Sequence, residues 1–220
     1  MYRKRAMAVF DLDGTFIDVD SSWRLVHRIL GTEKAAEENM ELYMRGEISY
    51  EEWAKRDVAL WAGVSMKCLA EKVKTTVKPM KNLDTAVNLL RRSGIAVGVI
   101  SSGIDVVLSS LENMELDFIK INRIILENDL IKGVEVEVGF DKRDILTSIS
   151  KDMAIPMNNI AVVGDGENDV SMFELPVGLR IAFNPRSRRL VELADYIVSY
   201  KDLLPVAEII LDWFNNLGSK

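Results

Sequence analysis

The sequence is poor in cysteine and histidine and has no long apolar run, and each absence excludes a class of protein. Its 220 residues include one cysteine, Cys68, so no disulfide can form within the chain; this fits a reducing compartment. No stretch approaches the ~18 apolar residues of a membrane-spanning helix. The basic start, residues 1–5, leads into five apolar residues before Asp11, which is too short for the core of a signal peptide. We therefore expect a cytoplasmic protein.

The charge balance is acidic, which bears on the partners of the protein. The formal net charge is −6, with 34 acidic and 28 basic residues. A negative net charge argues against a broad nucleic-acid footprint and against binding to anionic membranes. Hydrophobic residues make up 48% of the chain, which is enough for a sizeable core. The net charge does not argue against a locally positive pocket, and composition leaves the oligomeric state open.

Residues 6–10 predict a short buried strand, and two carboxylates, Asp11 and Asp13, follow at its end. Residues two apart in an extended chain point to the same side, and Gly14 lets the backbone turn sharply. Two close carboxylates disfavour each other's ionisation unless a cation lies between them. Because Mg²⁺ is a hard cation that takes oxygen ligands, the stretch indicates a Mg²⁺ site. The alternative is a polar strand end with a turn, since Asp and Gly are ordinary turn residues.

The segment from Asp18 to about Lys78 is predicted to be helical. Ser21 and Ser22 can cap a first helix that ends at Gly31, and further helices are expected at 33–45, 50–61 and 65–76. Three of the four tryptophans lie here, and packing between helices is the simplest role for most of them. Since the segment directly follows the first strand, we interpret it as an insert over the carboxyl end of that strand.

From Asn82 onward, helices and apolar strands alternate. We expect strands at 95–100, 160–163, 179–183 and 196–198, a hairpin formed by 119–126 and 130–138, and helices at 83–93, 105–114, 142–153, 170–175 and 203–217. Such alternation indicates an α/β fold with a parallel sheet covered by helices on both faces.

Polar residues follow three of the predicted strands, and ligands of open α/β sheets bind beyond the carboxyl ends of the strands. Besides Asp11 and Asp13, these residues are Ser101-Ser102-Gly103 and Gly164-Asp165-Gly166-Glu167-Asn168-Asp169, with Lys142 at a helix start between them. A carboxylate can attack phosphorus, and a nearby acid can protonate the leaving alcohol. Lysine, hydroxyl and amide donors can hold phosphoryl oxygens. The set therefore suits hydrolysis of a phosphate monoester.

Four parts of the sequence resemble, in order, the four motifs of the haloacid-dehalogenase superfamily: Asp11–Thr15, Ser101, Lys142 and Gly164–Asp169. The forms DxDGT and GDGxND are those of its phosphatases. The whole chain resembles the phosphoserine-phosphatase branch, which implies a Rossmann-like parallel sheet with an inserted helical cap. The resemblance implies a core domain of residues 1–17 and 79–220 and a cap of residues 18–78.

The resemblance also implies a role for each matching residue. Asp11 is the implied nucleophile and a Mg²⁺ ligand, and Asp13 the implied general acid/base, with its backbone carbonyl also on the metal. Asp165 is the implied third protein ligand of the metal. Asp169 is implied either to lie next to the metal ligands without binding the metal itself or to bind a water molecule on the metal. The implied phosphate-binding residues are Ser101, Ser102, Gly103 and Lys142. Here Ser102 stands where the family often has glycine, which leaves the local backbone geometry open.

Phosphoserine is the leading substrate on this resemblance, and it needs partners for an ammonium and a carboxylate. Asp20 stands where the family typically places a glutamate for the ammonium, and Asn168 is expected near the substrate. Arg56 is the nearest arginine for the carboxylate, but a strict alignment puts Asp57 at that place. An acid there would repel a substrate carboxylate.

Three other functions remain open at this point. The enzyme could hydrolyse another small phosphate, such as phosphoglycolate or a sugar phosphate, or transfer the phosphoryl group to an alcohol other than water. A binding protein without activity is the third, although the presence of both Asp11 and Asp13 argues against it. We expect His27, the single histidine, to be a packing or surface residue. The basic run 186–189 is interpreted as a solvated helix face.

Overall fold

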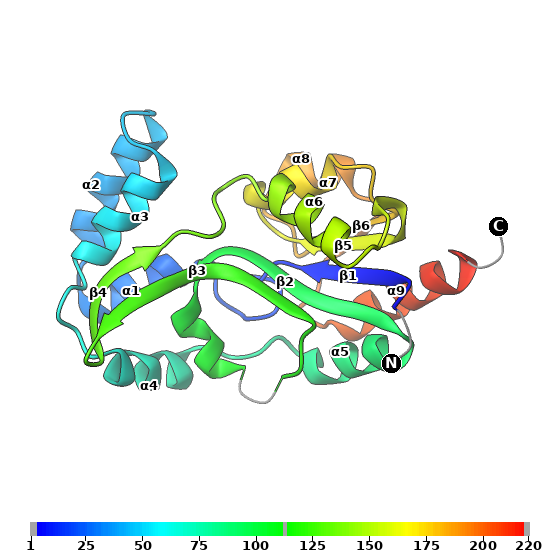
Figure 1. Cartoon of the computed structure of the whole chain (residues 1–220), viewed down its shortest axis with the longest axis horizontal. Coiled ribbons are helices and arrows are strands. Elements are labelled where there is room, and N and C mark those ends of the chain that lie inside the picture. Colours follow the sequence, from blue (N-terminus) through cyan, green and yellow to red (C-terminus); the bar gives the residue numbers. More distant parts are fainter. Residues whose placement is uncertain (1–3, 112–113, 218–220) are drawn as a thin grey trace.

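The computed structural model describes residues 4–111 and 114–217 and confirms the predicted α/β fold (Figure 1). Within these residues, seven strands form one sheet in the order β4-β3-β2-β1-β5-β6-β7. The strands are β1 (Ala6–Phe10), β2 (Ile95–Ile104), β3 (Phe118–Glu127), β4 (Leu130–Glu135), β5 (Ile160–Gly164), β6 (Leu179–Phe183) and β7 (Tyr196–Val198). All neighbours pair in parallel except β3 and β4, which form the predicted antiparallel hairpin.

Strand β1 lies at the centre of the sheet and is buried along its whole length. Its side chains alternate between the two faces: Ala8 and Phe10 pack into the apolar cluster on one face, Met7 and Val9 into the cluster on the other. A strand covered on both faces must be apolar at every position, which is why residues 6–10 carry no polar side chain. The carboxyl end of β1 is therefore the first point at which polar residues appear.

Helices cover both faces of the sheet, as expected (Figure 1). Helices α5 (Leu83–Arg92) and α9 (Leu204–Leu217) pack together on one face, while α6 (Arg143–Asp152), α7 (Val170–Phe173) and α8 (Arg188–Leu193) lie on the other. Two short 3₁₀ turns, η2 (Met157–Asn159) and η3 (Glu167–Asp169), flank β5.

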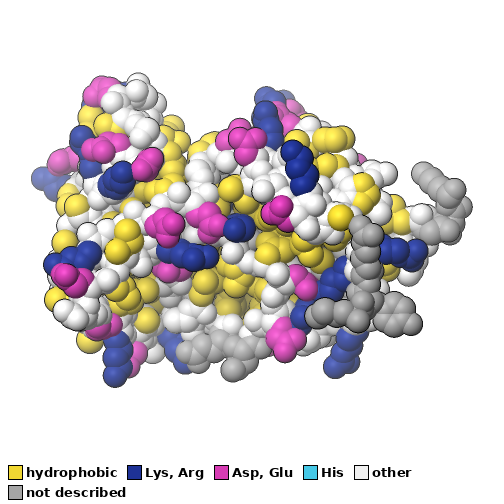
Figure 2. Space-filling model, in the orientation of Figure 1, with side chains coloured by type: hydrophobic (Ala, Val, Ile, Leu, Met, Phe, Trp, Pro, Cys, Tyr) yellow, Lys and Arg dark blue, Asp and Glu magenta, His cyan; other side chains and the backbone are white. Residues whose placement is uncertain are grey.

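The insert between β1 and α5 contains α1 (Ser22–Leu30), α2 (Glu33–Met44), α3 (Tyr50–Ala59) and α4 (Met66–Thr76). Its entry and exit run side by side, because the Asp18 amide donates to the Lys78 carbonyl (2.9 Å) and the Met80 amide to the Phe16 carbonyl (2.8 Å). Helices α2 and α3 project beyond the sheet (Figure 1). The space-filling view is hollowed between this projection and the lobe of α6, α7 and α8 (Figure 2).

The insert is also attached to the β3–β4 hairpin. The Gly63 amide donates to the Ile131 carbonyl (3.0 Å) and the Met66 amide to the Asp129 carbonyl (2.7 Å). Trp53, Val58 and Leu69 of the insert belong to the same apolar cluster as the sheet face beneath them. The insert thus shares its hydrophobic core with the sheet.

One predicted helix is wrong in type. Residues 105–114 were expected to form an α-helix, but the structure has a 3₁₀-helix, η1 (Asp105–Ser110), and residues 112–113 lie outside the described part. The hydroxyls of Ser109 and Ser110 donate to the carbonyls three residues earlier, at 2.8 and 2.7 Å. Serine competes with the backbone for such bonds, which favours the tighter turn. Strand β2 is also longer than predicted and continues through Ile104.

None of the helices in the described residues is both long enough and apolar enough to cross a membrane. Of the basic start discussed above, residues 1–3 lie outside the part that the structure describes.

We expect Gly98→Ala to destabilise the fold, because a Cβ at Gly98 in β2 would lie 2.4 Å from the Phe118 ring. Overpacking of this kind typically lowers the free energy of unfolding by about 1–3 kcal/mol. Denaturant unfolding measures it. The matched control is Gly133→Ala in β4, where the nearest atom to a built Cβ, on Ile125, is 3.8 Å away. Equal stability of the two variants would contradict the close β2–β3 packing.

Candidate active site

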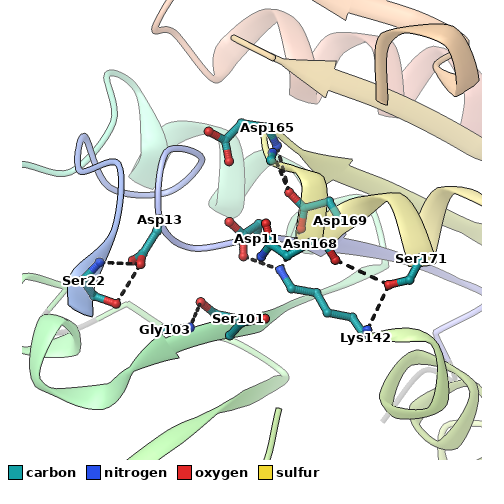
Figure 3. A network of polar contacts seen from close by, with 12 residues as sticks. Asp11, Asp13, Ser22, Ser101, Gly103, Lys142, Asp165, Asn168, Asp169 and Ser171 are labelled. Atoms are coloured by element: carbon teal, nitrogen blue, oxygen red, sulfur yellow. Dashed lines mark hydrogen bonds and ion pairs between the residues drawn. The ribbon is translucent and has the colours of Figure 1, made fainter. Parts of the chain in front are cut away.

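The carboxyl ends of β1, β2 and β5 bring the predicted polar residues together (Figure 3). Asp11 follows β1, Ser101 lies near the end of β2, and Asp165 follows β5. Each of the three is at most 2% exposed. Since β1 pairs with β2 on one side and β5 on the other, the parallel register alone places these three strand ends next to each other.

Lys142 is the positive charge of the site. Its Nζ donates to Asp11 Oδ1 at 2.5 Å and to Asp169 Oδ1 at 2.7 Å, and its side chain is 0% exposed (Figure 3). The backbone amide of Lys142 donates to the hydroxyl of Ser171 (2.9 Å), which holds the start of α6 against α7. Burial by itself lowers the pKa of this amine, but the two carboxylates outweigh it and raise the pKa above its ordinary value. Lys142 is therefore a permanent cation between the two acids.

Asp11, Asp165 and Asp169 form a buried carboxylate cluster in which one oxygen from each lies within 4.8 Å of the others. Asp169 is held from several sides: its Oδ2 accepts the backbone amides of Asp165 and Gly166, both at 3.0 Å. Asp165 Oδ1 is buried and has no hydrogen-bond partner among the described residues. An unpartnered carboxylate oxygen beside two more carboxylates fits a divalent cation that takes oxygen ligands.

Gly14 allows the first strand end to approach the third. Its φ of +82° lies in the left-handed region, and a Cβ there would fall 2.3 Å from Asp165 Oδ2. Only glycine combines this backbone conformation with the absence of a side chain. The predicted turn after Asp13 is therefore also the contact between the β1 and β5 ends.

Asp13 is held by the start of helix α1. Its Oδ2 accepts the amide (2.6 Å) and the hydroxyl (2.7 Å) of Ser22, while its Oδ1 is buried without a partner among the described residues. Of the two serines predicted to cap α1, Ser21 is the cap, because its hydroxyl accepts the Arg24 amide, whereas Ser22 binds Asp13. Nothing in the local pattern identifies the role of Ser22, because it depends on the chain returning to Asp13 nine residues later.

Burial dominates the electrostatics of the acids. Desolvation raises the pKa of Asp11 well above its ordinary range, and the charge of Asp169 adds to the effect. Desolvation also raises the pKa of Asp13, against the hydrogen bonds from Ser22, which lower it. For Asp165, burial followed by the charge of Asp169 raises the pKa to about 7. Without a cation the site thus holds protons that exposed aspartates release.

Ser101, Ser102 and Gly103 line the cavity above these acids. The Ser101 hydroxyl accepts the Gly103 amide at 3.0 Å, whereas the Ser102 hydroxyl donates to the Gly139 carbonyl at 2.6 Å. Ser101 is thus the hydroxyl of this segment that lies beside Asp13 and Gly103 (Figure 3).

The cavity over the carboxylates has a volume of about 200 Å³. Asp11, Asp13, Asp20 and Asn168 line it, so the structure brings Asp20 and Asn168 to the place expected for substrate-binding residues. Arg56 does not line it: this side chain is 43% exposed on α3 and pairs with Glu52 at 2.8 Å. The interpretation of Arg56 as a substrate ligand therefore has to be corrected, because the helix directs it to solvent.

Asp57, the neighbour of Arg56, points into the insert instead. It is 1% exposed, and its carboxylate accepts from Asn39 Nδ2 (2.8 Å) and lies 3.0 Å from His27 Nε2. Trp61 Nε1 donates to His27 Nδ1 (3.1 Å), so Nδ1 is an acceptor and Nε2 is the ring nitrogen that faces Asp57. Of the two roles expected for His27, packing or surface, the structure shows packing, since the residue is buried. A second cavity of about 540 Å³, bordered by His27 and Asp57, lies between α1, α2 and α3, and Asp11 and Asp13 do not line it.

Arg186 is a residue of the site that our sequence analysis missed. We had interpreted run 186–189 as a solvated face, but Arg186 Nε and Nη2 each lie 2.7 Å from Asp165 Oδ2. Both terminal nitrogens of the guanidinium also donate to the Asp20 carbonyl at 3.2 Å. Arg186 thus joins the end of β5 to the entry of the insert. No sequence signal identifies it, since the two partners lie 21 and 166 residues away.

The raised carboxylate pKa values predict how stability of the metal-free protein depends on pH. The pKa of Asp165 is about 7 in the folded protein and about 3.9 in the unfolded chain. The folded protein therefore binds this proton more tightly than the unfolded chain does. The stability that this protonation adds to the folded state is fully present below about pH 4 and is lost as the pH rises through about 7. In chelator, Tm should therefore fall by several degrees from about pH 5 to about pH 7.5, and by less in Asp165→Asn. An equal fall in both proteins would contradict the assignment.

Comparisons with known proteins agree with this geometry. The family model described as haloacid dehalogenase-like hydrolase matches residues 8–174. The chain is 28% identical over 214 residues to the phosphoserine phosphatase of Methanocaldococcus jannaschii, covering 96% of this chain and 100% of the relative.

Two solved structures are similar over nearly the whole chain. One, described as a phospho-aspartyl intermediate analogue of phosphoserine phosphatase, superposes with a TM-score of 0.77 at 28% identity and covers 94% of this chain and 99% of that chain. Another, a substrate-bound phosphoserine phosphatase complex, has a TM-score of 0.78 at 27% identity and covers 95% and 100%. The chain belongs to the haloacid dehalogenase-like hydrolases and is a phosphatase of their phosphoserine phosphatase-like branch.

Proposed function

We propose that this protein hydrolyses small phosphomonoesters through an aspartyl-phosphate on Asp11, with Mg²⁺ as cofactor. The observation that carries the proposal is the contact of Asp11 with Lys142 at 2.5 Å, at the base of a small cavity that Asp13 also lines. A nucleophile, a fixed cation and a second acid in one cavity are the parts that phosphoryl transfer needs. A volume of about 200 Å³ favours a compact substrate.

In the first step Asp11 attacks phosphorus with a carboxylate oxygen, and the bond between phosphorus and the leaving alcohol breaks. Asp13 supplies the proton that the alcohol needs. The raised pKa of Asp13 supports this role, since burial favours its protonated form. The hydrogen bonds from Ser22 to Oδ2 leave Oδ1 free to face the leaving group.

In the second step water attacks the phosphorus of the aspartyl-phosphate and Asp13 accepts its proton. Inorganic phosphate leaves and Asp11 is regenerated. Lys142, Ser101 and the Gly103 amide would hold the phosphoryl oxygens through both steps. Lys142 is well suited because it is buried and already points at Asp11.

The metal would be held by Asp11, Asp165 and the backbone carbonyl of Asp13. Asp169 would orient Asp165 and Lys142 without binding the metal directly. When bound, it offsets the negative charge that builds up as carboxylate and phosphate approach each other. Asp169 is suited to an orienting role because its two oxygens are already engaged by Lys142 and by two backbone amides.

The relatives named phosphoserine phosphatases make phosphoserine the first substrate to test. We further propose that residues 18–78 act as a cap that selects the leaving group, since Trp23, Tyr43 and Trp53 of this segment form one side of the cavity. We place the protein in the cytoplasm, in keeping with its single free cysteine, Cys68.

We expect Asp11→Asn to abolish turnover while the protein stays folded. The amide has nearly the same size but is a poor nucleophile, and removal of one charge from the carboxylate cluster should raise Tm in chelator. Phosphate release from p-nitrophenyl phosphate and thermal unfolding measure the two effects. Asp152→Asn, at an exposed position of α6, is the control and should change neither. Turnover within about tenfold of wild type, a loss of only ~1.4 kcal/mol in the barrier, would exclude Asp11 as the nucleophile.

Activity should require Mg²⁺, disappear in excess chelator and return when Mg²⁺ is added. Ca²⁺ should substitute poorly, because it takes more ligands at longer distances and would let a carboxylate bind through both oxygens. Initial rates with each ion after chelation test this. Full activity in chelator would rule out the metal-dependent mechanism.

A further inference from the structure

The side of the cavity formed by the insert is a wall of four aromatic rings, Trp23, Tyr43, Tyr50 and Trp53. The ring centroids of Trp23 and Trp53 are 4.7 Å apart and those of Tyr50 and Trp53 5.1 Å, while Tyr43 lies 6.0 Å from Trp53. The rings thus brace one another. We call these four residues the aromatic wall.

The polar atoms of the aromatic wall are mostly directed away from the substrate. Trp23 Nε1 and the Tyr50 hydroxyl both donate to the Ser102 carbonyl, at 2.9 and 2.6 Å. Burial also raises the pKa of Tyr50, so its hydroxyl stays protonated. Trp53 Nε1 is buried and without a partner among the described residues. A single neutral N–H group would compensate the negative charge of a substrate carboxylate poorly. The wall therefore offers ring carbon to a ligand.

The mouth of the cavity is apolar as well. Met44, at the end of α2, is 75% exposed, and Phe140, in the loop before Lys142, is 46% exposed, and both line the cavity. A substrate body that fills the space between them would cover apolar surface that now faces water.

The charges around this apolar surface are predominantly acidic. Asp11, Asp13 and Asp20 line the cavity, and within the described residues Arg186 is the basic residue that does so. The charge of Arg186 is already engaged by Asp165 Oδ2 at 2.7 Å. Asp20 Oδ1 lies 3.6 Å from Arg186 Nη1, but the Asp20 side chain is 86% exposed, so a ligand cation can still reach it. Aromatic faces beside an exposed carboxylate attract cations.

A carboxylate on the leaving group finds no such partner from the insert. Arg56 pairs with Glu52 at the surface, and buried Asp57 interacts with His27 and Asn39. Asp57 lines the second cavity and not this one, so neither of the two positions expected to bind a carboxylate places a cation beside the leaving group.

We propose that the leaving group of the substrate is an alcohol that carries an ammonium or quaternary ammonium group and no carboxylate, held between the aromatic wall and Asp20. The proposal rests on the proposed phosphatase function and narrows its substrate class. It ranks phosphomonoesters of amino alcohols above phosphoserine.

Two matched pairs of substrates test it on the Mg²⁺-loaded enzyme. Phosphoethanolamine and phosphoserine differ by one carboxylate, and phosphocholine and 3,3-dimethylbutyl phosphate have the same shape but differ in charge. We expect kcat/KM to be at least about tenfold higher for the first member of each pair. The p-nitrophenyl ester, which carries neither group, is the reference for general phosphatase activity.

Variants of Tyr43 test the aromatic wall, because this side chain is only partly buried and its removal should not unfold the protein. Tyr43→Leu should lower the ratio of kcat/KM for phosphocholine over its neutral analogue by about fivefold or more, whereas Tyr43→Phe, which keeps the ring, should retain the ratio. Arg56→Ala is the control and should leave both pairs unchanged. Thermal unfolding checks that each variant is folded.

The two proposals fail in different ways. Hydrolysis of p-nitrophenyl phosphate with phosphoserine preferred over phosphoethanolamine would overturn the substrate class and leave the phosphatase intact. Equal rates for phosphocholine and its neutral analogue would overturn the role of the cation. No hydrolysis of any ester with Mg²⁺ present would contradict the proposed function itself.

Discussion

The ion pairs between Lys142 and the carboxylates of Asp11 and Asp169 are the interaction on which the rest of the site depends. A buried charge is tolerated only when it is paired and hydrogen-bonded, and Lys142 meets this condition with two acids and no exposure. Its partners come from the ends of β1 and from the segment after β5, while its own backbone is held by Ser171 on α7. Three segments that are distant in sequence are therefore brought together at this lysine. The excess of negative charge that remains makes the carboxylate cluster suitable for a metal ion.

The parallel sheet places this cation where chemistry is possible. Because β1 is central and apolar throughout, its polar residues begin only where the strand ends, and β2 and β5 end beside it. The insert then begins within a few residues of Asp13, so the start of α1 both holds Asp13 through Ser22 and brings the aromatic wall over the cavity. The residues that we propose to bind the phosphoryl group thus come from the sheet and the start of α6, and those that we propose to contact the leaving group come from the insert. This separation would let substrate choice vary without disturbing the chemistry.

Arg186 and Asp57 show how charges outside the motifs shape the site. Arg186 joins a carboxylate of the cluster to the entry of the insert, so the electrostatics of the two parts are linked through one guanidinium. Asp57 is held inside the insert by His27 and Asn39, so its carboxylate lies within the helices of the insert and not beside the substrate.

The sequence by itself determined the α/β class, most strands and helices, and the residues of the catalytic cluster. These follow from local causes: apolar runs of strand length, glycines at turns, and carboxylates or hydroxyls directly after a strand. The shorter turn at η1, the hold of Ser22 on Asp13, the role of Arg186 and the outward direction of Arg56 were decided only by the tertiary structure. Each of them depends on which distant segment packs alongside, or on the rotation of a helix against its neighbours. Arg56 at the surface and Asp57 in the interior are adjacent positions on one helix, and adjacent positions do not share a face. Local pattern specifies that a helix forms, but the packing of its apolar face decides which of two neighbouring charged residues meets the substrate side.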